Sequence, residues 1–168
     1  MTSNLIALST KKVMKLKLYK PKLEELWFRA SILEDKETMS YNEAWGGTIS
    51  FPKEEWKDWY NNWVINNENK RYYRYLINDD GIFVGEVAYH YDPSYDGYMA
   101  NVIIHAKYRN NGYGTLGLKM LCEIAKENGI TSLYDDIAIN NPAIKMFLDM
   151  GFIEQYRTKD IILLCKQL

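Results

Sequence analysis

A basic turn rich in asparagine and glycine lies near the middle of the chain, and its residue types suit the binding of an anion. It consists of Arg109-Asn110-Asn111-Gly112-Tyr113-Gly114-Thr115 and follows the apolar run Ile103-Ile104-His105-Ala106. A helical pattern starts directly after it. Glycine lets the backbone approach a ligand closely, and the first N–H groups of a helix have no partner within that helix. The helix dipole adds positive charge, so we expect this turn to hold a phosphate or pyrophosphate.

Gly112, Gly114 and Gly117 also match G-x-G-x-x-G, so a Rossmann-like nucleotide binder is one interpretation. In that fold the glycines directly follow the first strand, whereas six residues, 106–111, separate His105 from Gly112 here. Only 54 residues follow Gly114, too few for the further parallel strands that such a domain needs. A P-loop is excluded because no Gly-Lys-Ser/Thr follows. A tight turn with a purely structural role is a further interpretation.

Hydropathy patterns predict the elements that must position this turn. Strands are expected at residues 13–19, 71–78, 82–91, 97–105, 131–139, 152–156 and 160–166. Helices are expected from Pro21, with Leu23, Leu26, Trp27 and Ala30 on one stripe, at 34–42, from Pro52, at 112–128 and at 140–150. An antiparallel meander followed by a βαβ crossover predicts a mixed α/β fold, with one mixed sheet and helices on both faces.

Length and composition predict one domain. The chain has 168 residues, of which 47% are hydrophobic and 26% charged. We expect the domain to span residues 13–168, after a loose N-terminal extension at 1–12. The net charge is −1, so the protein has no overall positive field that would attract nucleic acid. The sequence contains no run of eighteen apolar residues, so we expect no membrane span.

The cysteines and the first residues bear on the compartment. Cys122 and Cys165 lie far apart in apolar surroundings, and we expect them to be reduced core residues of a cytoplasmic protein. Lysines follow the short apolar run at 5–8, which is the wrong order for a signal peptide. Two cysteines and two histidines without clustered spacing predict no metal site.

A second motif starts thirty residues beyond Asn110, with Asn140-Asn141-Pro142-Ala143 followed by Phe147 and Gly151-Phe152. Asn and Pro alone are typical of a helix start, but that does not explain the later spacing. Together, Arg109-x-x-Gly112-x-Gly114 and Asn140-x-x-Ala143-x-x-x-Phe147-x-x-x-Gly151-Phe152 resemble the motifs of the GCN5-related N-acetyltransferase (GNAT) family. The resemblance covers about residues 13–168 and is sharpest over 81–153.

The resemblance implies the GNAT fold, a mostly antiparallel central sheet with one splayed parallel pair, and acetyl-CoA as co-substrate. In the family, backbone amides of the first motif hold the pyrophosphate, which here implies residues 109–115, with a hydroxyl donor from Thr115. It further implies that Ile104 and Ala106 pair with the pantetheine arm, and that an amide near Ile104 stabilises the developing oxyanion. Asn140 matches the family's cofactor-contacting Asn, and Ala143 and Phe147 are expected near the pantetheine and its thiol. Many family members pair, which favours a homodimer.

Amine acetylation needs a base, because an alkyl amine with a pKa near ~10.4 is protonated at neutral pH. Glu86 is our first candidate, since it lies amid apolar neighbours of a strand and shares a face with His90 four residues on. The alternative for Glu86 is a buried structural pair with an Arg or Tyr. His90 is expected to assist, and Asp136 to recognise a cationic acceptor. Members of the family commonly protonate the leaving thiolate with a Tyr, for which this chain has Phe147.

Two further patterns have competing explanations. Trp56, Trp59 and Trp63 at near-helical spacing indicate a packed core, with an aromatic cage for a cation as the alternative. His105, at the end of the strand before the turn, is expected to be structural.

We therefore predict an N-acetyltransferase. It transfers an acetyl group from acetyl-CoA to a primary amine of a small molecule or protein, by direct attack in a ternary complex. A non-catalytic acyl-CoA-binding module is the alternative that Phe147 motivates.

Overall fold

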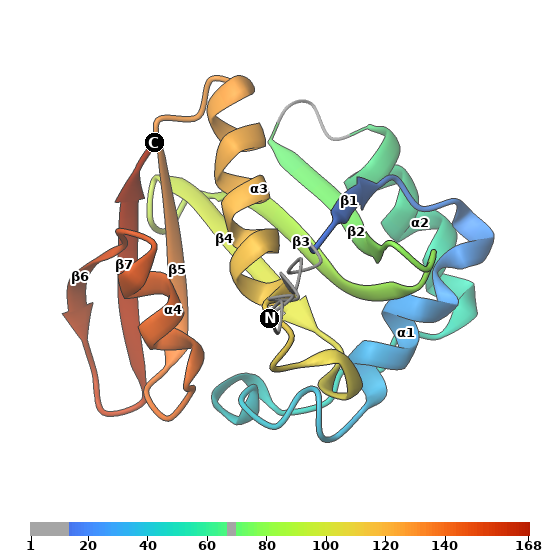
Figure 1. Ribbon diagram of the computed structural model, residues 1–168, viewed down its shortest axis with the longest axis horizontal. Helices are drawn as coiled ribbons and strands as arrows, with labels where there is room; N and C mark the ends of the chain where they lie inside the picture. Colours follow the sequence, from blue (N-terminus) through green and yellow to red (C-terminus); the bar gives the residue numbers. More distant parts are fainter. Residues whose placement is uncertain (1–13, 67–69) are drawn as a thin grey trace, which may run out of the picture.

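The computed structural model describes residues 14–66 and 70–168, which form a seven-stranded sheet in the order β1-β2-β3-β4-β5-β7-β6 (Figure 1). The strands are β1 Leu16–Tyr19, β2 Arg71–Asn78, β3 Phe83–Asp92, β4 Gly97–Ile104, β5 Ser132–Ala138, β6 Ile153–Arg157 and β7 Ile161–Gln167. Within these residues β4 and β5 are the single parallel pair, and the other neighbours are antiparallel. This arrangement confirms the predicted mixed sheet and contradicts a Rossmann-like fold.

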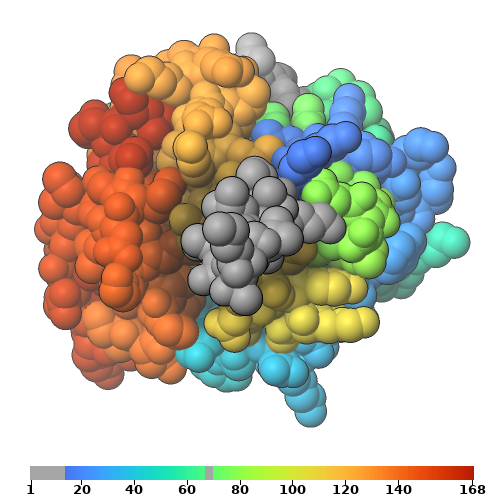
Figure 2. Space-filling model, in the orientation of Figure 1, coloured from blue at the N-terminus to red at the C-terminus, as the bar shows by residue number. Residues whose placement is uncertain are grey.

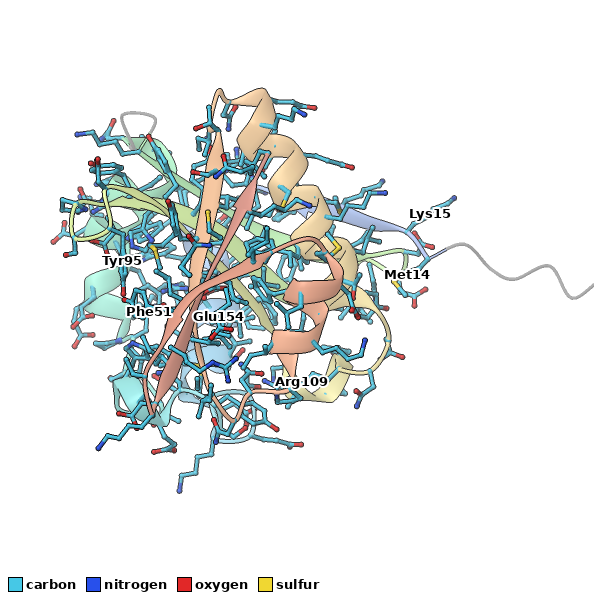
Figure 3. The ribbon with its side chains drawn as sticks, turned by 90° about the vertical axis from the view of Figure 1, so that its left-hand side faces the viewer. Met14, Lys15, Phe51, Tyr95, Arg109 and Glu154 are labelled. Atoms are coloured by element: carbon cyan, nitrogen blue, oxygen red, sulfur yellow. The ribbon has the colours of Figure 1, made fainter. Side chains whose placement is uncertain are left out.

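Helices cover both faces of the sheet, as expected. The α-helices are α1 Trp27–Glu34, α2 Trp56–Tyr60, α3 Tyr113–Glu127 and α4 Ala143–Asp149. In the edge-on view, α3 and α4 lie on one side of the strands, while Phe51 and the N-terminal helices lie on the other (Figure 3). Neighbouring residues of β2 and β3 point to opposite faces and are apolar on both, so two cores form. Val87 and Tyr89 belong to the core under α3, whereas Ala88 belongs to the core under α1 and α2.

The two halves of the chain lie on opposite sides of the molecule. Figure 2 shows the residues from β5 onward, in orange and red, on the left and the blue and green N-terminal half on the right. The parallel β4–β5 pair joins them, and its register has only two residue pairs, Tyr98↔Leu133 and Met99↔Tyr134. Beyond Met99 and Tyr134 the two strands diverge, which leaves a gap in the middle of the sheet.

The prediction of a helix at 34–42 was wrong. The helix α1 ends at Glu34, and turns follow up to a 3-10 turn at Glu43–Trp45. The carboxylate of Asp35 accepts hydrogen bonds from the Thr38 backbone N–H (2.8 Å) and hydroxyl (2.5 Å). Such local side-chain bonds compete with helix formation and favour a turn.

The predicted apolar stripe of the first helix was also partly wrong. Leu26 is buried, but Trp27 is 55% exposed, and the helix buries Phe28, Ile32 and Leu33 instead. A separate 3-10 turn at Leu23–Glu25 precedes α1 and changes the phase of the pattern. Hydropathy alone did not reveal this break.

The helix expected from Pro52 is a succession of three short pieces. A 3-10 turn at Lys53–Glu55 leads into α2, and a π-helical turn at Asn61–Ile65 follows. Trp56, Trp59 and Trp63 nonetheless pack against the core under α1 and α2, which agrees with the core interpretation.

Gly85 allows β3 and β4 to approach each other closely. A Cβ atom at Gly85 would lie 2.3 Å from the backbone oxygen of Ile103 and 2.8 Å from a methyl carbon of Ile104. Both neighbours belong to β4, so a side chain at residue 85 would push β4 towards β5. The glycine therefore helps to keep the gap beside β4 open.

We expect Gly85→Ala to lower the free energy of unfolding by about 2 kcal/mol or more, because the added methyl overpacks a backbone contact that cannot move freely. Gly81→Ala is the control. It adds a Cβ in open space at φ 74°, and should cost only backbone strain, about 1 kcal/mol. Chemical denaturation measures both losses, and equal losses would contradict the proposed contact.

Candidate functional site

The turn before α3 presents a row of free backbone N–H groups. Its conformation depends on two left-handed residues, Asn110 (φ 62°) and Gly112 (φ 81°). Leu116 is the first residue after the turn whose N–H has a backbone acceptor, the oxygen of Gly112 at 3.1 Å. Within residues 14–66 and 70–168, the backbone N–H groups of residues 110–115 have no acceptor. With the positive end of the α3 dipole behind them, these groups fit a diphosphate.

The Arg109 side chain shapes this turn from within. Its guanidinium donates to the backbone oxygens of Thr38 (2.6 Å), Glu37 (3.4 Å) and Ile104 (3.3 Å). Figure 3 places Arg109 at the end of the molecule where α3 begins. The hydrogen bonds of the Arg109 side chain therefore connect the loop after α1 to the end of β4. These contacts involve the side chain of Arg109, whereas the ligand is expected to bind its backbone.

The end of β4 differs from the expectation for Ala106. Its backbone N–H donates to the Thr38 hydroxyl (3.0 Å), so it is not free to pair with a pantetheine arm in this structure. Ile104 agrees with the expectation. The His105 N–H bonds the oxygen of Val84 in β3 (3.0 Å), and antiparallel alternation then turns the N–H of Ile104 away from β3, towards the gap. His105 itself caps the 3-10 turn Ala106–Tyr108 by accepting from the Lys107 N–H (3.1 Å), which is a structural role.

The second motif forms the start of α4 as expected, but Phe147 is placed differently. The Asn141 side chain accepts from the Ala143 N–H (2.9 Å) and caps the helix, which leaves Asn140 exposed beside it. Phe147 is only 3% exposed and packs edge-to-face on Phe152, with ring centroids 5.0 Å apart. In this structure Phe147 is therefore a core residue that offers little surface to a ligand.

A cavity of about 370 Å³ lies beside the gap between β4 and β5. Its lining residues are Arg29, Asn42, Trp45, Trp59, Trp63, Tyr73, Ala88, His90, Asp92, Met99, Ala100, Asn101, Asp135 and Asp136. Most of them come from the face under α1 and α2. Ala100 belongs to the core on the opposite face, under α3, so the cavity reaches into the gap itself. Of the residues predicted to be catalytic, the cavity brings together His90 and Asp136.

Glu86 lies outside that lining and is fully buried. One carboxylate oxygen accepts from Arg29 Nη1 at 2.5 Å, and the other accepts from the Tyr73 hydroxyl. Burial raises the pKa of Tyr73 well above its usual range, and the charge of Glu86 raises it further, so Tyr73 stays a donor. Burial alone would lower the pKa of Arg29, but the charges and hydrogen bonds of Glu86 and Tyr73 together raise it. The structure thus favours the structural pair over the base that we expected.

One of the three tryptophans belongs to an aromatic cage, but the cation in that cage is part of the protein. The Arg29 guanidinium lies over Trp59 (4.4 Å from the ring centre), Tyr73 (5.3 Å) and Phe51 (5.4 Å). Trp63 stacks on Trp59 at 5.8 Å and 16°, and Arg71 lies over Trp63 at 5.0 Å. The faces of Trp59 and Trp63 are therefore occupied, and the Arg29 Nε–H is buried without an acceptor among the described residues.

Burial changes the pKa values of the carboxyl groups and of the imidazole that line the acidic wall of the cavity. Burial raises the pKa of Asp135 well above its usual range, and the charge of Asp136 adds to the rise. Burial also raises the pKa of Asp136, while a hydrogen bond from its own backbone N–H opposes the rise. Burial lowers the pKa of His90, although Asp92 and Asp136 oppose that effect. A carboxyl group with a raised pKa in a cleft is a candidate acid or base.

Sequence reasoning missed the roles of Arg29, Asp92 and Trp45 in this cavity. Arg29 meets Glu86 across 57 residues of sequence, a contact that no local pattern predicts. Asp135 was not among the predicted catalytic residues; as the strand neighbour of Asp136, it has a side chain that points to the opposite face. The cavity reaches both residues because the sheet is open between β4 and β5.

In residues 14–66 and 70–168, no group of three or more His, Cys, Asp or Glu residues could hold a metal ion. No helix in the same ranges is both long and apolar enough to span a membrane. Cys122 and Cys165 are both buried and unpaired.

Solved structures share this fold. The spermidine N-acetyltransferase of Vibrio cholerae, in complex with CoA and spermine, matches with a TM-score of 0.77 and 17% identity, over 90% of this chain and 95% of that one. A GNAT-family acetyltransferase of Bacillus anthracis matches with a TM-score of 0.70 and 18% identity, over 93% and 96%. A Salmonella typhimurium protein with its cofactor acetyl-CoA matches with a TM-score of 0.71 and 16% identity, over 94% and 95%.

The family assignment comes from the sequence. The model of the acetyltransferase (GNAT) family matches residues 31–152, which include the glycine turn at 109–115, the gap-forming strands and the second motif. The chain therefore belongs to the GNAT family and is an N-acetyltransferase whose acetyl donor is acetyl-CoA.

Proposed function

We propose that this enzyme acetylates the primary amine of a small cationic molecule, which attacks acetyl-CoA directly in a ternary complex. One observation carries the proposal. The cavity has an acidic wall on the face under α1 and α2 and reaches into the gap that leads to the anion-binding turn. An amine in the cavity and a thioester beside β4 would meet in that gap.

The charges that line the cavity favour a cation. Asp92, Asp135 and Asp136 line it, whereas the one lining Lys or Arg among the described residues is Arg29, which Glu86 neutralises. A cleft with an excess of one charge sign raises the local concentration of the opposite sign. We assign Asp136 to binding the acceptor's ammonium group, as the sequence-based hypothesis has it, and His90 to the same task in place of the assisting role expected for it.

The size of the cavity favours a small molecule over a folded protein. A volume of about 370 Å³ falls at the lower end of the range for small-ligand sites. The Vibrio cholerae relative, which is named for spermidine and has spermine bound, supports a small amine as acceptor. An exposed lysine side chain of a protein is the second candidate, because it is also a narrow primary amine.

The residues around the turn fit the donor. The N–H groups of residues 110–115 would bind the diphosphate, and the N–H of Ile104 faces the gap, where it would pair with the pantetheine arm. Acetyl-CoA supplies an activated acetyl group there. Asn140 is exposed at the start of α4 and is expected to contact the same ligand.

Glu86 is assigned a positioning role in this proposal. Its carboxylate fixes Arg29 and Tyr73, which line the cavity, while Glu86 itself does not. The network thus keeps one wall of the acceptor site rigid and electrically neutral.

An acceptor screen tests the proposal. The full chain is incubated with acetyl-CoA and a panel of polyamines, monoamines, zwitterionic amino acids and lysine peptides, and free thiol and acetylated product are measured. We expect transfer to small cationic amines and little transfer to zwitterions. Stabilisation by CoA without transfer to any amine would instead support a non-catalytic acyl-CoA-binding module.

Gly112→Asp should weaken CoA binding at least about tenfold, equivalent to about 1.4 kcal/mol, because it places a carboxylate among the amides that face the diphosphate. Gly129→Asp is a matched control, since Gly129 also has φ 81° but lies beyond the other end of α3 with nothing within 4 Å of its added Cβ. Calorimetric titration with CoA measures both. Equal affinity for the two variants would remove the turn from the binding site.

Glu86→Gln should lower the free energy of unfolding by about 3 kcal/mol, because Arg29 loses its buried counter-charge. Turnover should fall while CoA affinity stays near normal. The pH dependence of kcat should keep its wild-type shape, since Glu86 has no contact with the cavity. Loss of the ascending limb of that profile would return Glu86 to the role of base.

A further inference from the structure

Asp135 occupies the point where the sheet opens. The last β4–β5 register pair is Met99↔Tyr134, so Ala100 and Asp135 are the first residues of the two strands beyond it. Both line the cavity. The next lining residues along the diverging strands are Asn101 and Asp136. Asp135 is therefore at the apex of the gap.

The apex is also where the reactive end of the donor should arrive. The anion-binding turn follows the far end of β4, and Ile104 and Ala100 are about 13 Å apart along an extended strand. A chain held by its diphosphate at the turn and extended along β4 would point towards Ala100. The acetyl thioester, at the end of that chain, would thus approach Asp135.

The Asp135 side chain lies on the donor side of the sheet. Strand alternation places it on the same face as Leu133 and Ile137, which belong to the core under α3 and α4. It accepts a hydrogen bond from the Asp136 backbone N–H and makes no ion pair among the described residues. Asp135 is half-buried and lines the cavity, so its carboxyl group borders open space. Asp136 points to the acceptor face.

Other proton carriers near the cavity are less suitable. The Tyr73 hydroxyl donates a hydrogen bond to the Glu86 carboxylate, so both groups are occupied by each other. Phe147, at the motif position where the family commonly has Tyr, has no proton to give and is buried in the core. His90 pairs with Met99 in the register, which places it beside the closed part of the β4–β5 pair.

We propose that Asp135 carries the proton in acetyl transfer, accepting it from the acceptor amine and returning it to the sulfur of CoA. This inference rests on the proposed function. The Asp135 carboxylate takes one proton from the ammonium group, and the neutral amine forms the N–C bond to the acetyl carbon. As the C–S bond breaks, its electron pair leaves with sulfur, which takes the proton from the Asp135 carboxyl. The nitrogen loses its second surplus proton to solvent, so the products are the amide, CoA thiol and one proton.

The charges around Asp135 suit both halves of this cycle. The charge of Asp136, on the same strand, raises the pKa of Asp135, and the charge of Asp92, across the cavity on β3, raises the pKa of Asp136. Burial lowers the pKa of His90 on β3, and Arg29 on α1 is neutralised by Glu86. Tyr73 on β2 is held by the same Glu86. A carboxyl group that binds a proton more tightly than usual is a better match for an amine and a thiol.

The test compares Asp135→Asn with Asp136→Asn, the same substitution on the adjacent residue and the opposite face. Asp135→Asn should lower kcat about 10²-fold or more at neutral pH, with unchanged CoA affinity. The deficit should shrink as pH rises, because free amine then forms without a base. Asp136→Asn should mainly raise KM for the acceptor. Asp135→Glu keeps a carboxyl group and should retain more activity than Asp135→Asn.

A second measurement does not depend on turnover. Carbon NMR titration of the ligand-free wild type should find one Asp carboxyl well above its usual pKa. That signal should be absent in Asp135→Asn and should move down in Asp136→Asn. An Asp135 carboxyl pKa in the usual range for aspartate would overturn the proposal. A kcat of Asp135→Asn within about threefold of wild type would also overturn it. Wild-type protein that transfers acetyl to no amine would instead overturn the proposed function, whatever the titration gives.

Discussion

The early end of the β4–β5 pairing is the constraint on which the site depends. A regular parallel pair would bind the backbone groups of β4 to β5 along their whole length and leave no room between them. Here the ladder stops after two residue pairs. The backbone groups at the end of β4 are used elsewhere, because Arg109 bonds the oxygen of Ile104 and Thr38 accepts from the N–H of Ala106. The gap is thus held open from outside the sheet.

The loop after α1 consequently links the donor and acceptor sides. Thr38 is fixed by Asp35 on one side and bonds Ala106 on the other. Nearby, Asn42 and Trp45 line the acceptor cavity. The pKa of Asp35 is lowered by the Thr38 hydroxyl and N–H, so this anchor stays charged and intact at neutral pH. A segment without a helix or strand therefore supports both halves of the site.

Much of the donor half could be predicted from sequence, because it depends on local backbone chemistry. The glycine turn, α3 and α4 lie close to the predicted positions, and Asn141 caps α4 as Asn-Pro suggests. The acceptor half depends on contacts between distant segments. A tryptophan repeat indicates that rings gather on one side, but not that Arg29 fills the space between them. Likewise, the burial of Glu86 was expected from its neighbours, whereas its partners on β2 and α1 were visible only in the folded chain.

The buried Arg29–Glu86 pair also explains why the cavity has an acidic character despite an arginine in its wall. Removing two charges from water is costly, and it is tolerated here because each is bonded to the other and aromatic rings surround the cation. Once paired, they contribute little net field to the cavity. The field then comes from the carboxylates of β3 and β5, whose charges are not matched by a lining cation among the described residues. Those carboxylates also repel one another, which favours a shared proton. The same wall therefore attracts an ammonium group and is suited to take a proton from it.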